Sequence, residues 1–411
     1  MFDIFKFSQY NEFITIAERI IAMTDIKKIM QHEIDNQKFT SGVNLLVLVD
    51  GKEVIYEEYG YRDAENKVPF SRDTITRLYS MSKPVTAAAA MILADRGLLD
   101  LGACLCWTMP GFSEAYYNTD GNRVKATQQI TVKDLLNMTS GIPYPGDTPS
   151  SQQVGGVFWE LNERLHTDNP MTTAEFARRI GACDLSFNPG DRFMYGASAD
   201  VLGALIEQVS GMTLGEFMKK EIFEPLGMND TGFYVKPESK HRLAKVYRTD
   251  YANWCIEPVF TEHLGVPVTD TPPAFESGGA GLYSTLDDYA KFATMLMNGG
   301  ELNGKRILSQ NAVNYLTSPS LTSWQIDTLS RDWRSLSGYS YGNLMRNLVN
   351  PGQAYVLSEE GEYGWDGWLG CFFANYPKSK MTILMTMQRV DCGTAALTRK
   401  LINAIRGELV K

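Results

Sequence analysis

The sequence has little positive charge. Its 411 residues include 39 lysines and arginines against 48 aspartates and glutamates, which gives a formal net charge of -9 at pH 7. No basic stripe stands out along the chain. Because clustered lysines and arginines supply the affinity for a phosphate backbone, this balance argues against nucleic acid and anionic membrane surfaces as partners.

Long hydrophobic runs are also missing. The longest covers residues 85–94 and is interrupted by Thr86, far short of the ~20 residues that cross a bilayer. The N-terminal stretch has no basic start, and Asp3, Glu12 and Glu18 interrupt it, so we expect no secretory signal. These absences predict a cytoplasmic protein with no membrane partner.

Cysteine and histidine are few and irregularly spaced. Six cysteines without framework spacing predict six reduced thiols. None of the four histidines pairs with another at metal-ligand spacing, so we expect no metal site and no cofactor. The cysteines are Cys104, Cys106, Cys183, Cys255, Cys371 and Cys392.

Strand patterns lie near the two ends of the chain. Asp50-Gly51 is typical of a type I′ turn, which needs positive φ at both central residues, and it predicts a hairpin. We expect one sheet covered by the first and last helices. The predicted strands are 42–49, 53–60, 341–349, 370–377 and 381–389, and the covering helices are 13–37 and 394–408.

Helix and loop patterns fill the middle of the chain. Predicted helices cover 130–141, 201–211, 214–227 and 282–300. We therefore expect two domains, one made of residues 1–103 and 272–411 and a mainly helical one of residues 104–271. A cleft between two such lobes is a common place for an active site.

Residues 80–83 form an S-x-x-K motif at the start of a predicted helix over 82–95. Residues i and i+3 share a helix face, so the Lys83 amine can reach the Ser80 hydroxyl. A serine needs a base to become a nucleophile, and burial lowers a lysine pKa toward that role. This helix is apolar on nearly all faces, which predicts burial. The plain alternative is Ser80 as a helix cap and Lys83 as a solvated lysine.

Two further segments carry candidate chemistry. Tyr195 lies between a turn and a helix and is a second proton-transfer candidate if a nearby lysine depresses its pKa. The glycine-rich stretch 364–370 precedes a predicted strand and allows a backbone N–H to approach an oxyanion. Taken alone, Tyr195 is more often an ordinary packed aromatic, and the glycine-rich stretch is more often an ordinary turn.

Six ordered segments resemble the serine β-lactamase and penicillin-binding-protein superfamily, most closely its class C-like esterases and carboxypeptidases. The resemblance extends from Gly42 to the C-terminus and implies a β-lactamase/transpeptidase-like fold, α/β plus all-α, with an antiparallel sheet. The segments are LYSMSKPVTAAAAMILADRGLLDL, ITVKDLLNMTSGI, PGDRFMYGASADVLGALIEQVSG, FEPLGMNDTGF, GGAGLYSTLDDYAKFATMLMNGG and YGWDGWLGCFFANYP.

Matched residue by residue, the resemblance implies that Ser80 is the acylating nucleophile. Lys83 and Tyr195 would be its base and proton relay, and which of them is the base stays open. The backbone N–H groups of Ser80 and Trp368 would form the oxyanion hole. Residues 365–367 (Trp365, Asp366 and Gly367) would bind substrate, in place of the family's Lys-Thr-Gly on the edge strand.

The sequence also departs from the family pattern. Trp365 replaces a lysine and Asp366 adds negative charge, which weakens recognition of a substrate carboxylate. Tyr195-Gly196-Ala197 stands for the usual Tyr-Ser-Asn, and Asn137 stands where a histidine is usual. At residues 365–366 and 196–197, the sequence resembles esterases of the family more than its cell-wall enzymes.

We therefore expect a serine hydrolase that acts on small acyl esters. The alternatives are a D-alanyl-D-alanine carboxypeptidase or weak β-lactamase, an acyltransferase, and an inactive binding or sensor protein on the same fold. The expected partner is a small ester or amide substrate. Loops at 144–157, 262–278 and 318–338 would shape its pocket, and the candidate lining aromatics are Tyr144, Trp159, Trp324, Trp333 and Trp368.

Overall fold

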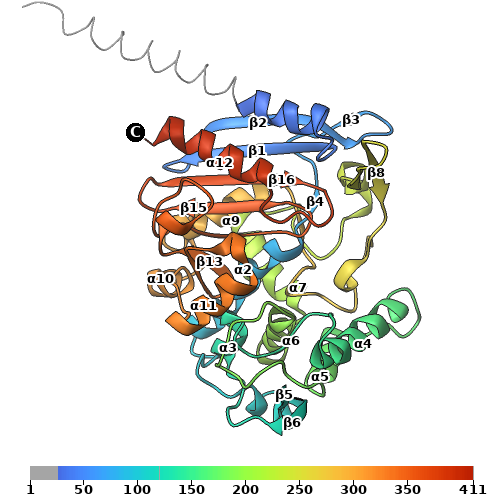
Figure 1. Ribbon diagram of the computed structural model, residues 1–411, viewed down its shortest axis with the longest axis vertical. Helices are drawn as coiled ribbons and strands as arrows, with labels where there is room; N and C mark the ends of the chain where they lie inside the picture. Colours follow the sequence, from blue (N-terminus) through green and yellow to red (C-terminus); the bar gives the residue numbers. More distant parts are fainter. Residues whose placement is uncertain (1–25, 120, 411) are drawn as a thin grey trace, which may run out of the picture.

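The computed structural model describes residues 26–119 and 121–410 (Figure 1). Residues 26–31 are α-helical and continue into a π-helical turn, η1 (His32–Asn36). This is the C-terminal part of the helix expected over 13–37. The rest of that prediction lies outside the described residues.

An eight-stranded sheet joins the two ends of the chain, with the strand order β12-β13-β14-β15-β16-β1-β2-β3. Every neighbouring pair is antiparallel, and β1 pairs with β16 from Val43↔Met387 to Val49↔Met381. The predicted single antiparallel sheet is confirmed. Its strands are β1 (Gly42–Val49), β2 (Lys52–Asp63), β3 (Val68–Pro69), β12 (Tyr339–Gly342), β13 (Met345–Leu348), β14 (Tyr363–Asp366), β15 (Phe372–Tyr376) and β16 (Met381–Met387).

Two turns of this sheet test the sequence predictions. Asp50 and Gly51 both have positive φ, 50° and 70°, as a type I′ hairpin requires. The single strand expected over 341–349 is wrong, because Asn343 and Leu344 also have positive φ, 51° and 62°, and turn the chain into the β12–β13 hairpin.

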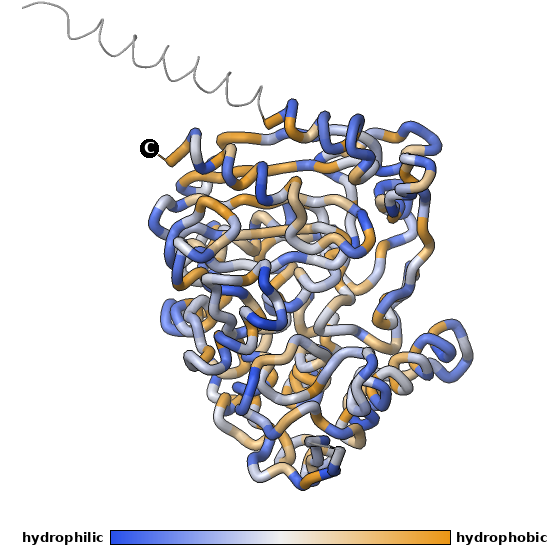
Figure 2. The backbone as a smooth tube through the Cα atoms, in the orientation of Figure 1, coloured by the Kyte–Doolittle hydropathy of each residue, from blue (hydrophilic) through white to orange (hydrophobic). Residues whose placement is uncertain are grey.

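Each face of the sheet packs against helices. In β1, Val43, Leu45 and Val47 point to the face covered by α12 (Ala396–Leu409) and the helix over 26–36. Leu46 and Leu48 point to the opposite face, toward α2 (Ser82–Asp95) and α9 (Leu286–Met297). Hydrophobic colours accordingly concentrate along the central strands, while loops at the rim are hydrophilic (Figure 2).

The middle of the chain forms a helical region beside the sheet (Figure 1). The helix predicted over 130–141 is shorter, because Met138 adopts left-handed φ and ψ of 56° and 37° and ends α3. Most of the loop expected at 144–157 is the helix α4. The two-domain division stays a prediction. The helices here are α3 (Val132–Asn137), α4 (Pro149–Arg164), α5 (Thr173–Ile180), α6 (Ser198–Ser210), α7 (Leu214–Met218) and α8 (Glu224–Leu226).

Short elements complete the described part of the chain. The pairing of β4 with β9 fastens the residues before the S-x-x-K motif to those before α9. The remaining elements are α10 (Gln310–Leu316), α11 (Ser323–Asp332), β4 (Thr76–Arg77), β9 (Tyr283–Ser284), β5 (Tyr116–Thr119), β6 (Asn122–Lys125), β7 (Val246–Asp250), β8 (Cys255–Val259), β10 (Glu301–Leu302) and β11 (Lys305–Arg306).

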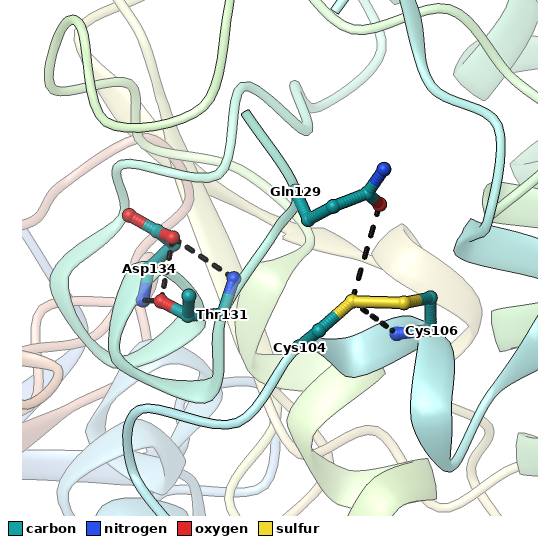
Figure 3. Close-up of a disulfide and its surroundings, with 5 residues drawn as sticks. All are labelled: Cys104, Cys106, Gln129, Thr131 and Asp134. Atoms are coloured by element: carbon teal, nitrogen blue, oxygen red, sulfur yellow. Dashed lines mark hydrogen bonds between the residues drawn. A yellow bond between two sulfur atoms is a disulfide. The ribbon is translucent and has the colours of Figure 1, made fainter. Parts of the chain in front are cut away.

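The expectation of six reduced thiols is wrong. Cys104 and Cys106 form a disulfide beside the capping box of α3, in which Thr131 and Asp134 bond each other's backbone (Figure 3). Their Cα atoms lie 5.3 Å apart, within the range that a disulfide spans, although the sequence spacing matches no disulfide framework. The cytoplasmic location, which rested partly on reduced thiols, stays a prediction. Within residues 26–119 and 121–410, no helix combines the length and apolar character needed to cross a bilayer.

Candidate active site

Helix α2 presents the S-x-x-K motif at its N-terminus. Every residue from Ser82 to Leu93 is buried, which confirms the predicted central helix. Ser80 precedes it in the 3-10 turn η2 (Tyr79–Met81), and Tyr79 has a positive φ of 46°. A non-glycine residue in that region is strained, and such strain gathers at functional sites.

The Lys83 amine lies 3.1 Å from the Ser80 Oγ. It also donates to the Gly279 carbonyl at 2.8 Å and lies 3.1 Å from the Tyr144 Oη. The lysine has no exposed surface. Burial lowers the pKa of Lys83 to about 7, although the negative charges of Asp200 and Asp366 oppose the shift. A large fraction of the amine is therefore neutral near pH 7 and can accept the serine proton.

Tyr195 lies over this amine, but its pKa moves opposite to the expectation. The Lys83 Nζ is 4.6 Å from the centre of the Tyr195 ring, and the Trp365 Nε1 donates to the Tyr195 Oη at 3.1 Å. Burial raises the pKa of Tyr195, and hydrogen bonds with Ser80 and Trp365 only partly offset the rise. The phenol therefore stays protonated at neutral pH.

Tyr144 is a polar partner that sequence reasoning missed. The sequence predicts it only as an aromatic residue lining the pocket. Its hydroxyl instead contacts the Lys83 amine, and its ring centre lies 5.7 Å from that of Tyr195. Burial raises its pKa well above the usual value. The chain places it 61 residues from Lys83, and no local pattern marks it for this contact.

The residues expected to bind substrate lie on β14. Here the edge-strand assignment is wrong, because β14 pairs with β13 on one side and β15 on the other. The pairing with β13 ends at Arg346↔Gly364, however, one residue before Trp365. Trp365 is buried against Tyr195 and Tyr341, with ring centres at 5.5 and 5.0 Å.

Asp366 ends β14, and Gly367 follows it toward the segment that carries Ser80. The Thr394 hydroxyl donates to the Asp366 carboxylate, and burial raises the pKa of this carboxyl group. A Cβ on Gly367 would lie 2.2 Å from the Leu78 carbonyl oxygen, so only glycine allows β14 to approach the segment before Ser80. This approach brings the following residue, Trp368, to the same cavity as Ser80.

That cavity has a volume of about 460 Å³ and opens beside Ser80. Two predicted lining residues, Trp159 and Trp324, instead lie on the surface with exposed fractions of 66% and 56%. Toward α12 the lining turns polar. The aromatic residues around it are Tyr144, Tyr195, Trp333, Tyr339, Tyr355, Trp365, Trp368 and Phe372.

Nowhere in residues 26–119 and 121–410 do three His, Cys, Asp or Glu side chains gather closely enough to hold a metal ion.

Comparison with known proteins places this geometry in a family. The sequence model of the family described as Beta-lactamase matches residues 26–405. The chain belongs to that family. The β-lactamase/penicillin-binding-protein resemblance and the fold class are thereby confirmed.

Relatives in the Beta-lactamase family cover nearly the whole chain. Protein Rv1367c of Mycobacterium tuberculosis (strain ATCC 25618 / H37Rv) is 30% identical over 87% of this chain and 88% of its own length. Esterase EstB of Burkholderia gladioli is 27% identical over 86% of this chain and 88% of its own. The solved structure of EstCE1, "a hydrolase with promiscuous acyltransferase activity", has a TM-score of 0.77 and 24% identity and covers 96% of this chain and all of that one.

Two departures from the family pattern have local structural causes. A Cβ on Gly196 would lie 2.0 Å from the Ile142 carbonyl oxygen, so the usual serine after the tyrosine does not fit this backbone. Asn137, where a histidine is usual, is buried and accepts the Asn343 backbone N–H at 3.3 Å. It thereby holds the β12–β13 turn beside the end of α3.

Proposed function

We propose that this protein is an esterase that cleaves small acyl esters through an acyl-enzyme on Ser80. The observation that carries the proposal is the buried Lys83 amine, 3.1 Å from the Ser80 Oγ, with a pKa of about 7. A neutral amine in that position is the base that a serine nucleophile needs.

Membership in the Beta-lactamase family makes the chain a serine hydrolase acting on ester or amide bonds. The similarity to Esterase EstB favours esters. The side chains at β14 favour them as well, because Trp365 and Asp366 supply no positive charge for the carboxylate of a peptide or β-lactam substrate. The carboxypeptidase and β-lactamase alternatives therefore rank lower.

The proposed reaction has two steps. The Ser80 oxygen bonds to the ester carbonyl carbon as its proton passes to the Lys83 amine, and the backbone N–H groups of Ser80 and Trp368 bind the resulting oxyanion. The carbon–oxygen bond to the alcohol then breaks, and the alcohol leaves with a proton. Water attacks the acyl-enzyme in the second step, which releases the acid and returns the proton to Ser80.

Lys83 and Tyr195 take different roles in this proposal. Lys83 is the base because burial lowers its pKa to about 7, whereas burial raises the pKa of Tyr195. Tyr195 is then a neutral phenol that passes its proton to the leaving alcohol and takes up the proton held by Lys83, so that both groups return to their starting forms. The hydrogen bond from Trp365 holds its oxygen at the cavity.

Substrate binding follows from the walls of the cavity. Trp333, Trp365 and Trp368 offer flat apolar surfaces near Ser80, which suit an acyl chain or an aromatic alcohol. Gly367 would let the substrate carbonyl reach the Trp368 N–H, and Asp366 disfavours an anionic substrate.

Acyl transfer to an alcohol is the second candidate. EstCE1, which is similar in structure, is described as having promiscuous acyltransferase activity. Adding 1-butanol to a hydrolysis assay separates the two. Butyl ester as the main product indicates transfer, and free acid as the main product indicates hydrolysis.

The test of the esterase proposal is Ser80→Ala with p-nitrophenyl acetate. We expect turnover to fall to background, while the control Ser335→Ala, a second serine lining the cavity, keeps turnover within about twofold of the wild type. A fluorophosphonate probe followed by mass spectrometry should label Ser80. Unchanged turnover in Ser80→Ala, or labelling at another serine, contradicts the proposal. A wild type that shows neither turnover nor labelling favours an inactive binding protein.

A further inference from the structure

The three contacts of the Lys83 amine are not equivalent. Ser80 and Tyr144 offer hydroxyl groups, which donate or accept, but the Gly279 carbonyl oxygen at 2.8 Å only accepts. A neutral amine has two N–H bonds and one lone pair. Because Gly279 always takes an N–H, it fixes the rotation of the amine and leaves the lone pair for the side that faces the hydroxyls.

A buried carboxylate binds the N–H of the same residue, Gly279. The Gly279 N–H donates to the Asp200 Oδ1 at 3.0 Å, and the Ser277 hydroxyl donates to the same oxygen at 2.5 Å. Asp200 lies in the first turn of α6 and is 1% exposed. Gly279 thus bonds Asp200 through its N–H and Lys83 through its carbonyl.

Close packing leaves the backbone around Gly279 little room to move. A Cβ on Gly279 would lie 2.9 Å from the Asp200 Oδ2 and 3.1 Å from the Tyr144 Oη. Farther along the segment, the Leu282 N–H donates to the Ser82 Oγ at 3.0 Å, which ties it to α2. Hydrogen bonds therefore link Asp200 to the Gly279 N–H, and the Gly279 carbonyl to the Lys83 amine.

We propose that Asp200 is a positioning residue for acyl transfer, which holds the Lys83 amine against Ser80 through the backbone of Gly279. The proposal rests on the proposed function. Asp200 is not a catalytic residue in this scheme, because it contacts neither Ser80 nor the cavity that would hold the substrate.

Asp200 also acts on Lys83 through its charge. The groups that influence or contact the amine are the carboxyl groups of Asp200 and Asp366, the hydroxyls of Ser80 and Tyr144, and the ring of Tyr195. Asp200 is the larger of the two charges that raise the pKa of Lys83. Asp200→Asn keeps an oxygen for both hydrogen bonds but removes the charge. The Lys83 pKa then falls, and the amine stays neutral to lower pH.

The experiment is the pH profile of kcat/KM for p-nitrophenyl acetate in the wild type, Asp200→Asn and Asp200→Ala. In Asp200→Asn we expect the acid limb to move to lower pH by roughly half a unit or more. Asp200→Ala loses both hydrogen bonds, so we expect kcat to fall about tenfold or more with little change in KM.

Asp288→Asn is the matched control. Asp288 is also a buried aspartate in the first turn of a helix, α9, where it accepts the Asp230 N–H at 2.7 Å. It does not line the cavity. The same chemical change there should lower thermal stability and leave the pH profile unmoved.

An Asp200→Asn profile that overlays the wild type overturns the proposal, and this variant decides the matter even where Asp200→Ala does not fold. A shift of equal size in Asp288→Asn overturns it too. Fluorophosphonate labelling separates the two hypotheses. A wild type not labelled at Ser80 contradicts the proposed function itself, whereas labelled Ser80 with an unmoved Asp200→Asn profile contradicts only the role of Asp200.

Discussion

At the scale of single residues, the site depends on the cost of burying charge. Lys83 has no exposed surface, and water that would solvate its ammonium form is replaced by the wall of α2 and the aromatic rings. The same burial shifts a lysine and a tyrosine in opposite directions, since it disfavours the charged form of each. Thus Lys83 becomes a base near neutral pH while Tyr195 remains an acid.

This difference predicts the pH dependence of the wild type. The active form needs a neutral Lys83, whose pKa is about 7, so kcat/KM should rise with pH through an acid limb centred near that value. Lys83→Ala removes the base, and we expect a loss of about 10²-fold or more across the whole range. Steady-state kinetics with p-nitrophenyl acetate from pH 5 to 9 checks both. A flat profile, or full activity in Lys83→Ala, would assign the base to another group.

At the scale of the elements, Gly196 shows how backbone contacts restrict the residues that follow the tyrosine. Its position against the Ile142 carbonyl leaves no room for a side chain, and the obstacle is backbone and cannot rotate away. Gly196→Ser restores the residue usual in the family and should destabilise the fold by about 1–3 kcal/mol and reduce turnover, because Tyr195 is displaced. Thermal unfolding and turnover measure this. Gly190→Ala, at a glycine with open space around it but positive φ, is the comparison for a purely backbone cost.

The elements also show what the sequence can and cannot predict. Helix α2 and strand β1 match their predicted bounds, because continuous apolar stretches are bounded by clear turn and cap signals. The β12–β13 turn was missed because Asn343 and Leu344 adopt positive φ without a glycine. At the site, the i, i+3 spacing predicts the Ser80–Lys83 contact. The contacts of Lys83 with Tyr144 and Gly279 join residues 61 and 196 apart, and no local pattern carries them.

At the scale of the whole molecule, the two ends of the described chain lie in one sheet. Strand β1 pairs with β16, so the first and last described strands lie together, and α2 is buried between this sheet and the helical region. Helix α6 packs on α2 and carries Asp200 in its first turn, with Tyr195 just before it. Ser80, Lys83 and Tyr195, the proposed nucleophile, base and acid, are thus positioned by contact between α2 and the segment before α6.

This arrangement predicts how the two proposed domains behave. A fragment of residues 104–271 would lose α2 and expose the apolar face of α6, including Val201 and Leu205, which are buried in the intact chain. We expect this fragment to show no cooperative thermal transition in calorimetry, whereas the full chain unfolds in one transition. Lys83 and Tyr195, which lie in different proposed domains, would then become ordered in the same folding transition. A sharp transition in the fragment would instead mean that the helical region folds independently, and that Lys83 and Tyr195 are brought together by docking of two folded bodies.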